Sequence, residues 1–263
     1  MISNEHTAAK AAANFRLRYG LGSAPISDLN DLIESRLQID VAILNMAPGL
    51  DGMVVQDPET GQRIISVACT LWPERQRATL AHELGHLELG DFAKDGVIEC
   101  ILRTSEEIRA DAFARHLLAP SEGVTGFLGG IQKTRRDLNE ADLSRVVRYF
   151  EVSTQIALIQ LDRAGWLAPG QREEWSSLSV GKLAARHGWT DEHQASQQKA
   201  NTPQAPMRIV ELAMDAYENN LIGLEVVARI RGLTTEKVQA ELNEYGIMPK
   251  PVELPTSRFG RRK

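Results

Sequence analysis

Two histidines four residues apart, in the run His82-Glu83-Leu84-Gly85-His86, form the pattern in the chain most directly suited to chemistry. On a helix, side chains at this spacing project from the same face, so one tetrahedral ion could accept both imidazoles. Glu83 lies one step round the helix, where it could take a proton from an attacking water. The pattern predicts one Zn²⁺ per chain, held by His82 and His86, with Glu83 as the catalytic base.

A third ligand is needed, and Glu107 is the favoured residue. Two histidines and one glutamate are the ligand set of one class of catalytic zinc sites. Asp111 lies four residues later on the same helical face, where it could accept the free N–H of a ligating histidine. Two alternatives remain open: Glu107 fits a helix-capping box that begins at Thr104, and Glu106 is another possible ligand.

The other histidines have no ligand-like spacing. His116 lies nine residues after Glu107, about half a turn away at roughly 100° per residue, so we expect it to point to the opposite side. The two cysteines, Cys69 and Cys100, form no metal-binding pair, and we expect free thiols in a reducing compartment.

The zinc helix is expected to run from Pro73 to Gly90, and apolar residues within it indicate that it packs into a core. A second helix is expected at 105–118. Before them, two helices at 7–19 and 27–37 are followed by three strand-like segments at 39–44, 52–55 and 63–69, the last two joined by a hairpin turn. The fold class is therefore α+β, with a small, mainly antiparallel sheet packed on a gluzincin-like zinc helix pair and followed by an all-α region.

After Pro120 the pattern changes to short helices. Residues 142–163 and 223–242 each predict a helix, a tight turn and a second helix, which is the layout of a helix-turn-helix unit. Residues 190–206 are rich in Gln, Ala, Ser and Asn and predict a flexible connector. The proline-containing, basic end from about residue 248 predicts disorder.

Composition places the chain among ordinary globular proteins, with 43% hydrophobic and 25% charged residues and a net charge of −5. No apolar segment approaches the length needed to cross a bilayer. The first residues have neither the basic start nor the apolar run of a secretion signal. We therefore expect a cytoplasmic location and no membrane partner.

The zinc helix resembles that of the ImmA/IrrE metallopeptidases in the run Thr79-Leu80-Ala81-His82-Glu83-Leu84-Gly85-His86. The second helix is also similar, with Glu107, Ala110-Asp111, Phe113-Ala114, Leu117-Leu118 and Pro120 in the family's pattern. The resemblance covers residues 28–120 and, more weakly, 138–168. Asp111 stands where the family commonly has Asn, and Ala78 replaces an aromatic residue.

The resemblance implies that His82, His86 and Glu107 are the zinc ligands and that Glu83 is the base. It also implies a bacterial or phage protein that acts on a helix-turn-helix transcriptional repressor and so relieves repression of mobile-element or stress-response genes. The expected organisation is a zinc metallopeptidase domain at 1–120, a helix-turn-helix-like region at 121–189, a flexible linker at 190–206, a second small helix-turn-helix-like unit at 207–247 and a disordered basic tail at 248–263.

Two further features of a peptidase site are expected. Substrate could bind as an additional strand on the segment Arg63 to Cys69. An oxyanion donor is also needed, and Tyr19 and Tyr149 are equal candidates for it.

The rival interpretation is a non-proteolytic regulator that binds the repressor or DNA through its helix-turn-helix-like units. Basic Arg229, Arg231 and Lys237 cluster around the second unit and are the candidate DNA-binding residues. Acidic Glu225, Glu236 and Glu241 alternate with them and would repel phosphate, so direct DNA binding is possible but not favoured.

Overall fold

The computed structural model describes residues 4–91 and 104–251 and separates the chain into two compact units, Met1–Pro203 and Gln204–Lys263. The first unit combines a three-stranded sheet with many helices, which confirms the α+β class. In the described parts of the chain, no helix is long and apolar enough to span a membrane.

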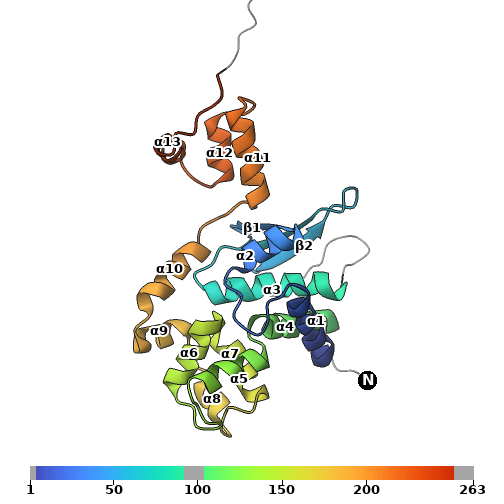
Figure 1. Ribbon diagram of the computed structural model, residues 1–263, viewed down its shortest axis with the longest axis vertical. Coiled ribbons are helices and arrows are strands. Elements are labelled where there is room, and N and C mark those ends of the chain that lie inside the picture. Colours follow the sequence, from blue (N-terminus) through green and yellow to red (C-terminus); the bar gives the residue numbers. More distant parts are fainter. Residues whose placement is uncertain (1–3, 92–103, 252–263) are drawn as a thin grey trace, which may run out of the picture. The chain divides into compact units, whose positions relative to one another are not determined.

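The first unit begins with the elements that the metal pattern requires. In chain order these are α1 (Asn4–Arg18), α2 (Leu29–Asp31), the π-helical turn η1 (Leu32–Arg36), β1 (Asp40–Leu44), β2 (Gly52–Gln56), β3 (Arg63–Ala68), α3 (Pro73–Leu89) and α4 (Ser105–Leu118). Figure 1 shows the sheet on one side of α3, with α4 and α1 on the other side.

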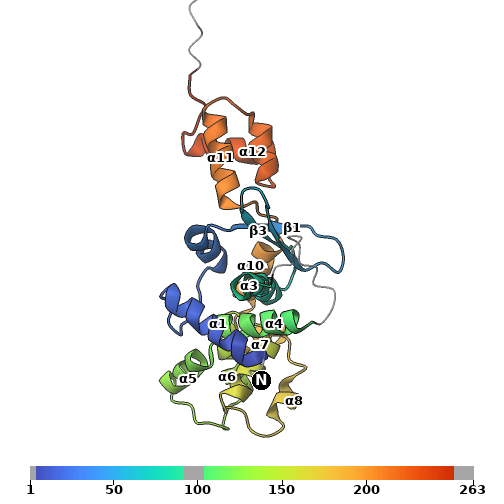
Figure 2. The ribbon, with the colours of Figure 1, turned by 90° about the vertical axis from the view of Figure 1, so that its right-hand side faces the viewer.

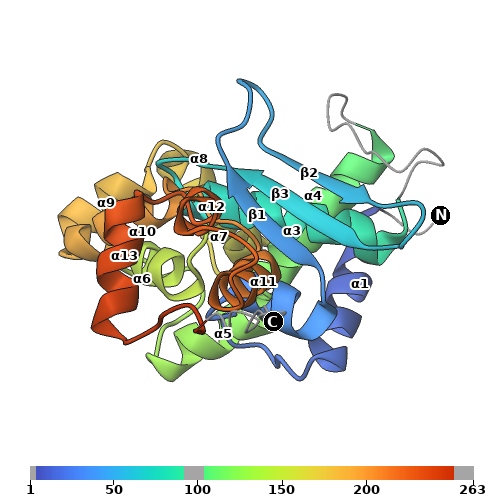
Figure 3. The ribbon, with the colours of Figure 1, turned by 90° about the horizontal axis from the view of Figure 1, so that it is seen from above.

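The sheet is mixed, whereas the sequence predicted a mainly antiparallel one. Its order is β1-β3-β2: β3 pairs in parallel with β1 and antiparallel with β2 (Figure 3). The hairpin between β2 and β3 was predicted correctly, and its turn is closed by a hydrogen bond from Gly61 N–H to the Asp57 carbonyl at 2.8 Å. The prediction of the sheet failed because β1 does not pair with β2, its neighbour in sequence; β3 lies between them.

Helix α3 has the expected bounds because both ends carry strong signals. Pro73 is its first residue, and Gly90 ends it in the left-handed conformation at φ 71°. In its second half, α3 packs against α4 at Gly85, where a Cβ atom would lie 3.0 Å from Phe113 Cδ1 and 3.3 Å from Ala110 Cα. The missing side chain at Gly85 therefore sets how closely the two helices approach, and Figure 2 shows α4 packed in turn against α1.

The rest of the first unit is helical. It contains α5 (Ser121–Gly130), α6 (Glu140–Phe150), α7 (Thr154–Arg163), α8 (Gln171–Trp175), α9 (Val180–His187) and α10 (Thr190–Ala200). The pair α6–α7 has the predicted helix-turn-helix layout, with a capping box at Asn139 and a Ser153 cap on the second helix.

The segment 190–206 was predicted to be a flexible connector, and for most of its length this is wrong because Thr190–Ala200 form α10. Its composition is polar, but Gln, Ala and Lys favour helices, and acidic residues occupy its first turn. The helix is docked through its end: the Ala200 carbonyl accepts hydrogen bonds from Thr70 N–H at 3.1 Å and from Gln76 Nε2 at 2.8 Å. The two units divide just after it, at Pro203.

The second unit contains α11 (Met207–Glu218), α12 (Leu224–Ile230) and α13 (Thr235–Glu244). These helices enclose a small core of their own, whose buried members are Tyr217, Val227, Ala228, Val238 and Leu242. Of the predicted disordered tail, residues 248–251 are irregular in structure and residues 252–263 lie outside the described residues.

Candidate metal centre

His82, His86 and Glu107 meet between α3 and α4. The His82 and His86 Nε2 atoms lie 3.1 Å apart, and the Glu107 carboxylate lies 3.1 Å from the first and 3.2 Å from the second. Three ligands around one tetrahedral ion, at bond lengths typical of zinc, would be about 3.3 Å apart. Two imidazole nitrogens and a carboxylate converging at this spacing fit a single metal ion, and no other group of three potential ligands was found among the described residues.

Glu107 lies where both predictions for it place it, in a helix cap and beside the two histidines. Its backbone N–H donates to the Thr104 hydroxyl at 3.4 Å, which is a helix cap, while its side chain faces the histidines. Glu106, the alternative ligand, turns away and pairs with Arg109 at 3.3 Å.

Each histidine also faces a carboxylate through its other ring nitrogen. His82 Nδ1 lies 3.0 Å from Asp111 Oδ1, the arrangement expected for Asp111. His86 Nδ1 lies 3.6 Å from Asp91 Oδ2, and Arg109 holds the other oxygen of Asp91 at 2.6 Å. A carboxylate in this place fixes the orientation of a ligating ring.

Sequence reasoning missed Asp91 and Arg109. Asp91 follows the left-handed Gly90, so its position depends on how the chain turns at the end of α3 rather than on helical spacing. The available signal in the sequence was an acid five residues after His86 together with an arginine between Glu107 and Asp111.

Glu83 lies beside the histidines and is 1% exposed. Burial, together with the nearby Glu107 carboxylate, raises the pKa of Glu83 to about 7, although His82 opposes this shift. A metal cation next to Glu83 would favour its ionised form. Strand β2 packs directly on this side chain: a Cβ atom on Gly52 would lie 2.8 Å from Glu83 Oε1.

A cleft of about 600 Å³ opens over His82, Glu83 and Glu107. One wall is β2 with the turn before it, the floor is α3, and the opposite wall includes Gln155, Ile156 and Ile159 of α7. The prediction that β3 holds substrate as an extra strand is wrong, because both of its edges are already paired. The edge strand along the cleft is β2.

The tyrosines proposed as oxyanion donors are elsewhere. Tyr19 packs on Phe15 at 4.6 Å between ring centroids, and Tyr149 stacks on Phe127 at 4.2 Å; neither lines the cleft. Arg75 and Arg115 are the cationic side chains in its wall.

Other predicted residues are placed as follows. His116 lies away from the centre, as expected, and pairs with Glu5 at 2.9 Å. Cys69 is a free thiol, while Cys100 lies outside the described residues. Among the candidate DNA-binding residues of the second unit, Arg229 and Lys237 are exposed, and Arg231 is paired with Glu241 at 2.9 Å.

The residues of the candidate metal centre also fall within a known family. Residues 34–162 match the Peptidase_M78 family, described as the IrrE N-terminal-like domain. These residues are an IrrE-like domain. The match covers β1 through α7 and so contains every residue of the candidate metal centre, which confirms the resemblance seen in the sequence and supports a metallopeptidase of the ImmA/IrrE type. No curated protein shows significant similarity to the chain.

Proposed function

We propose that the chain is a zinc-dependent endopeptidase that cleaves a partner helix-turn-helix transcriptional repressor, and so derepresses mobile-element or stress-response genes. The observation that carries the proposal is the convergence of His82, His86 and Glu107 beside a buried Glu83, on the floor of an open cleft. A site that only stored or bound metal would have no use for an acid in the place of Glu83.

The chemistry follows from the positions of the side chains. His82, His86 and Glu107 would hold the zinc, which when bound supplies Lewis acidity that activates a water near neutral pH and polarises the scissile carbonyl. Glu83 takes the proton of the attacking water and delivers it to the leaving amine. Asp111 holds the His82 ring in orientation through a hydrogen bond, and the Asp91 carboxylate lies 3.6 Å from the other nitrogen of the His86 ring.

The substrate is an extended segment lying along β2. An edge strand presents backbone groups that can pair with a peptide in β conformation. Because Gly52 of β2 contacts Glu83, a peptide paired with this strand would pass beside the catalytic base. Ile156 and Ile159 on the opposite wall would contact its side chains.

The test is co-expression with the repressor encoded beside the protein, followed by the intact mass of the repressor. Wild type should produce one discrete cut. Glu83→Gln should keep the metal and abolish the cut, because the amide accepts no proton. Glu106→Gln is the matched control, since Glu106 is on the neighbouring helix and outside the ligand group, and it should cut as wild type does.

Two outcomes would overturn the proposal. If Glu83→Gln cuts at the wild-type rate, Glu83 has no part in the reaction. An uncut repressor with repression still relieved, in both wild type and Glu83→Gln, would instead support a regulator that works by binding alone.

A further inference from the structure

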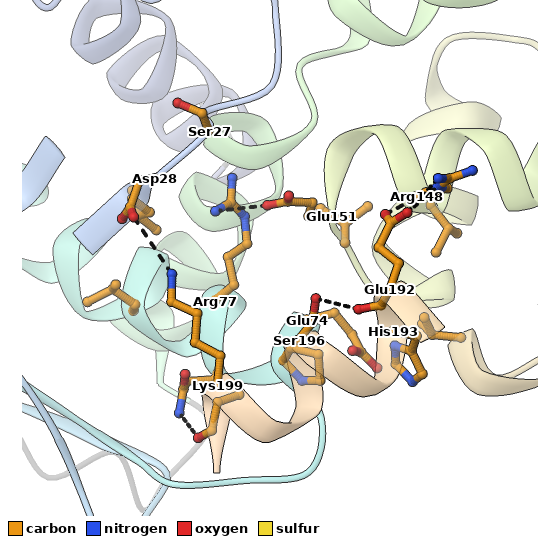
Figure 4. Close-up of a pocket in the computed structure, with 18 of the residues that line it drawn as sticks. Ser27, Asp28, Glu74, Arg77, Arg148, Glu151, Glu192, His193, Ser196 and Lys199 are labelled. Atoms are coloured by element: carbon orange, nitrogen blue, oxygen red, sulfur yellow. Dashed lines mark hydrogen bonds and ion pairs between the residues drawn. The ribbon is translucent and has the colours of Figure 1, made fainter. Parts of the chain in front are cut away.

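The first unit contains a second cavity, of about 220 Å³, on the opposite face of α3 from the metal cleft. Glu74 and Arg77 of α3 line it, whereas His82 and Glu83 line the cleft. Figure 4 shows the cavity between the start of α3, the turn that joins α6 to α7, and α10. Its apolar wall is formed by Leu29, Ile43, Leu80, Val147, Val152 and Trp189.

Three cations in the wall each have an acidic partner in the wall. The pairs are Arg77 with Glu151 at 3.3 Å, Arg148 with Glu192 at 2.5 Å, and Lys199 with Asp28 at 3.8 Å. Glu74 is the fourth acid. Its Oε2 atom is buried and has no hydrogen-bond partner among the described residues.

A buried carboxylate oxygen without a partner is costly, and the cost falls when a donor or cation meets it. Burial also raises the pKa of Glu74, although a backbone hydrogen bond and the neighbouring His193 oppose this shift. The neighbouring Arg77 does not pair with Glu74: its terminal nitrogens are directed to Glu151 and to the Ile26 carbonyl, and its Nε atom is buried without a hydrogen-bond partner among the described residues.

The charges in the cavity wall favour a cationic ligand over an anionic one. Four acidic side chains face three that are always cationic and the titratable His193, and each of the three cations is paired. A cation can meet Glu74 without breaking a contact, whereas an anion would find only the single Nε–H of Arg77 unpaired among the buried arginine and lysine nitrogens of the described wall.

We propose that this cavity binds a small organic amine, with its ammonium group on Glu74 and its apolar body between Leu80, Val147 and Trp189. The size agrees with such a ligand: in another protein, an engineered apolar cavity of about 150 Å³ holds one benzene molecule. A space of about 220 Å³ accommodates one ring with a short amine arm.

The test uses the full-length, zinc-loaded protein and benzylamine as the probe, with benzyl alcohol and benzoate as its neutral and anionic counterparts. Binding is followed by the NMR signals of the indole ring of Trp189, a residue of the cavity wall whose N–H donates to the Ser144 hydroxyl at 3.0 Å. We expect saturable binding of benzylamine in the millimolar range, and binding of the other two weaker by at least about tenfold. Absence of saturable binding, or a preference for benzoate, would overturn the proposal.

A pair of variants locates the ammonium group. Glu74→Gln keeps the size of the side chain but removes its charge, and it should weaken benzylamine binding about tenfold. Glu192→Gln, in the same wall but already paired with Arg148, is the matched control and should bind within about twofold of wild type.

Equal affinity in Glu74→Gln and wild type would place the amine elsewhere, for instance on the zinc, and would overturn the assignment. The comparison of the three ligands on the unaltered chain needs no variant to fold and no peptidase activity, so its result is independent of the proposed function.

Discussion

The two helix-turn-helix-like pairs, α6–α7 and α12–α13, have the same layout in sequence and different environments in the structure. The buried side chains of α6–α7 belong to the large core that also contains the strands, α3 and α4. Those of α12–α13 belong to a separate small core closed by α11. The first pair is therefore part of the peptidase unit, and its α7 supplies one wall of the metal cleft, while the second forms a unit of its own.

The turns of the two pairs show the same contrast. The α6–α7 turn passes through Glu151 in the left-handed conformation, at φ 52°, and its carboxylate pairs with Arg77 of α3. The α12–α13 turn uses Gly232 at φ 64°, a residue for which this conformation carries no steric cost. A short sequence pattern thus fixes the local turn, but packing decides whether the pair forms part of the site.

The largest expected difference between the pairs concerns their cores. Leu158→Ala in α7 and Leu242→Ala in α13 remove the same atoms from buried positions, 0% and 2% exposed respectively. Each should lower the free energy of unfolding of its own unit by about 3 kcal/mol. Only Leu158→Ala should lower the temperature at which peptidase activity is lost. Denaturant unfolding followed by circular dichroism checks the first effect. Peptidase activity measured against temperature checks the second.

A single shared transition, shifted equally by both variants, would contradict the separation of the cores. Residual activity that falls with Leu242→Ala as steeply as with Leu158→Ala would do the same.

The candidate metal centre was predictable from sequence where its geometry is local, whereas the meeting of its two helices depends on the packing of α4 on α3. Helical spacing alone brings His82 and His86 to one face, and the same rule places Asp111 beside Glu107. Asp91 was not predictable in this way, because it reaches His86 only through the turn at Gly90.

The errors arose where distant segments decide the structure. Strand order depends on which strands pair after the chain turns back, so the sequence placed substrate on β3, whereas β2 is the edge along the cleft. Helix α10 looked like a connector because its composition is polar. It is held by contacts to Thr70 and Gln76, more than a hundred residues away, which no local pattern records.

A smaller effect is expected from a substitution in the wall of the metal cleft, to which only the first pair contributes. Ile159→Ala in α7 removes apolar surface that would contact the substrate, and it should reduce kcat/KM for repressor cleavage about tenfold. Ile230→Ala in α12 is the matched control and should leave kcat/KM unchanged. A loss of the same size in both variants would show that the second unit also takes part in binding substrate.

The smallest expected effect tests whether Arg231, in the second pair, forms an ion pair or contacts DNA. Arg231 binds Glu241 with the two side chains 21% and 39% exposed, so Arg231→Ala should destabilise the second unit by about 0.5 kcal/mol at most. Arg229, which is exposed, is the comparison residue. Affinity for duplex DNA would be measured against salt concentration for wild type, Arg229→Ala and Arg231→Ala.

We expect the salt dependence of wild type and Arg231→Ala to be the same, because Glu241 already neutralises this arginine. A phosphate contact made by Arg231 would instead lower the slope of log affinity against log salt by about one. A lowered slope in both variants would make the second pair a DNA-binding unit. The second unit would then bind DNA, and the first pair would serve only the peptidase unit.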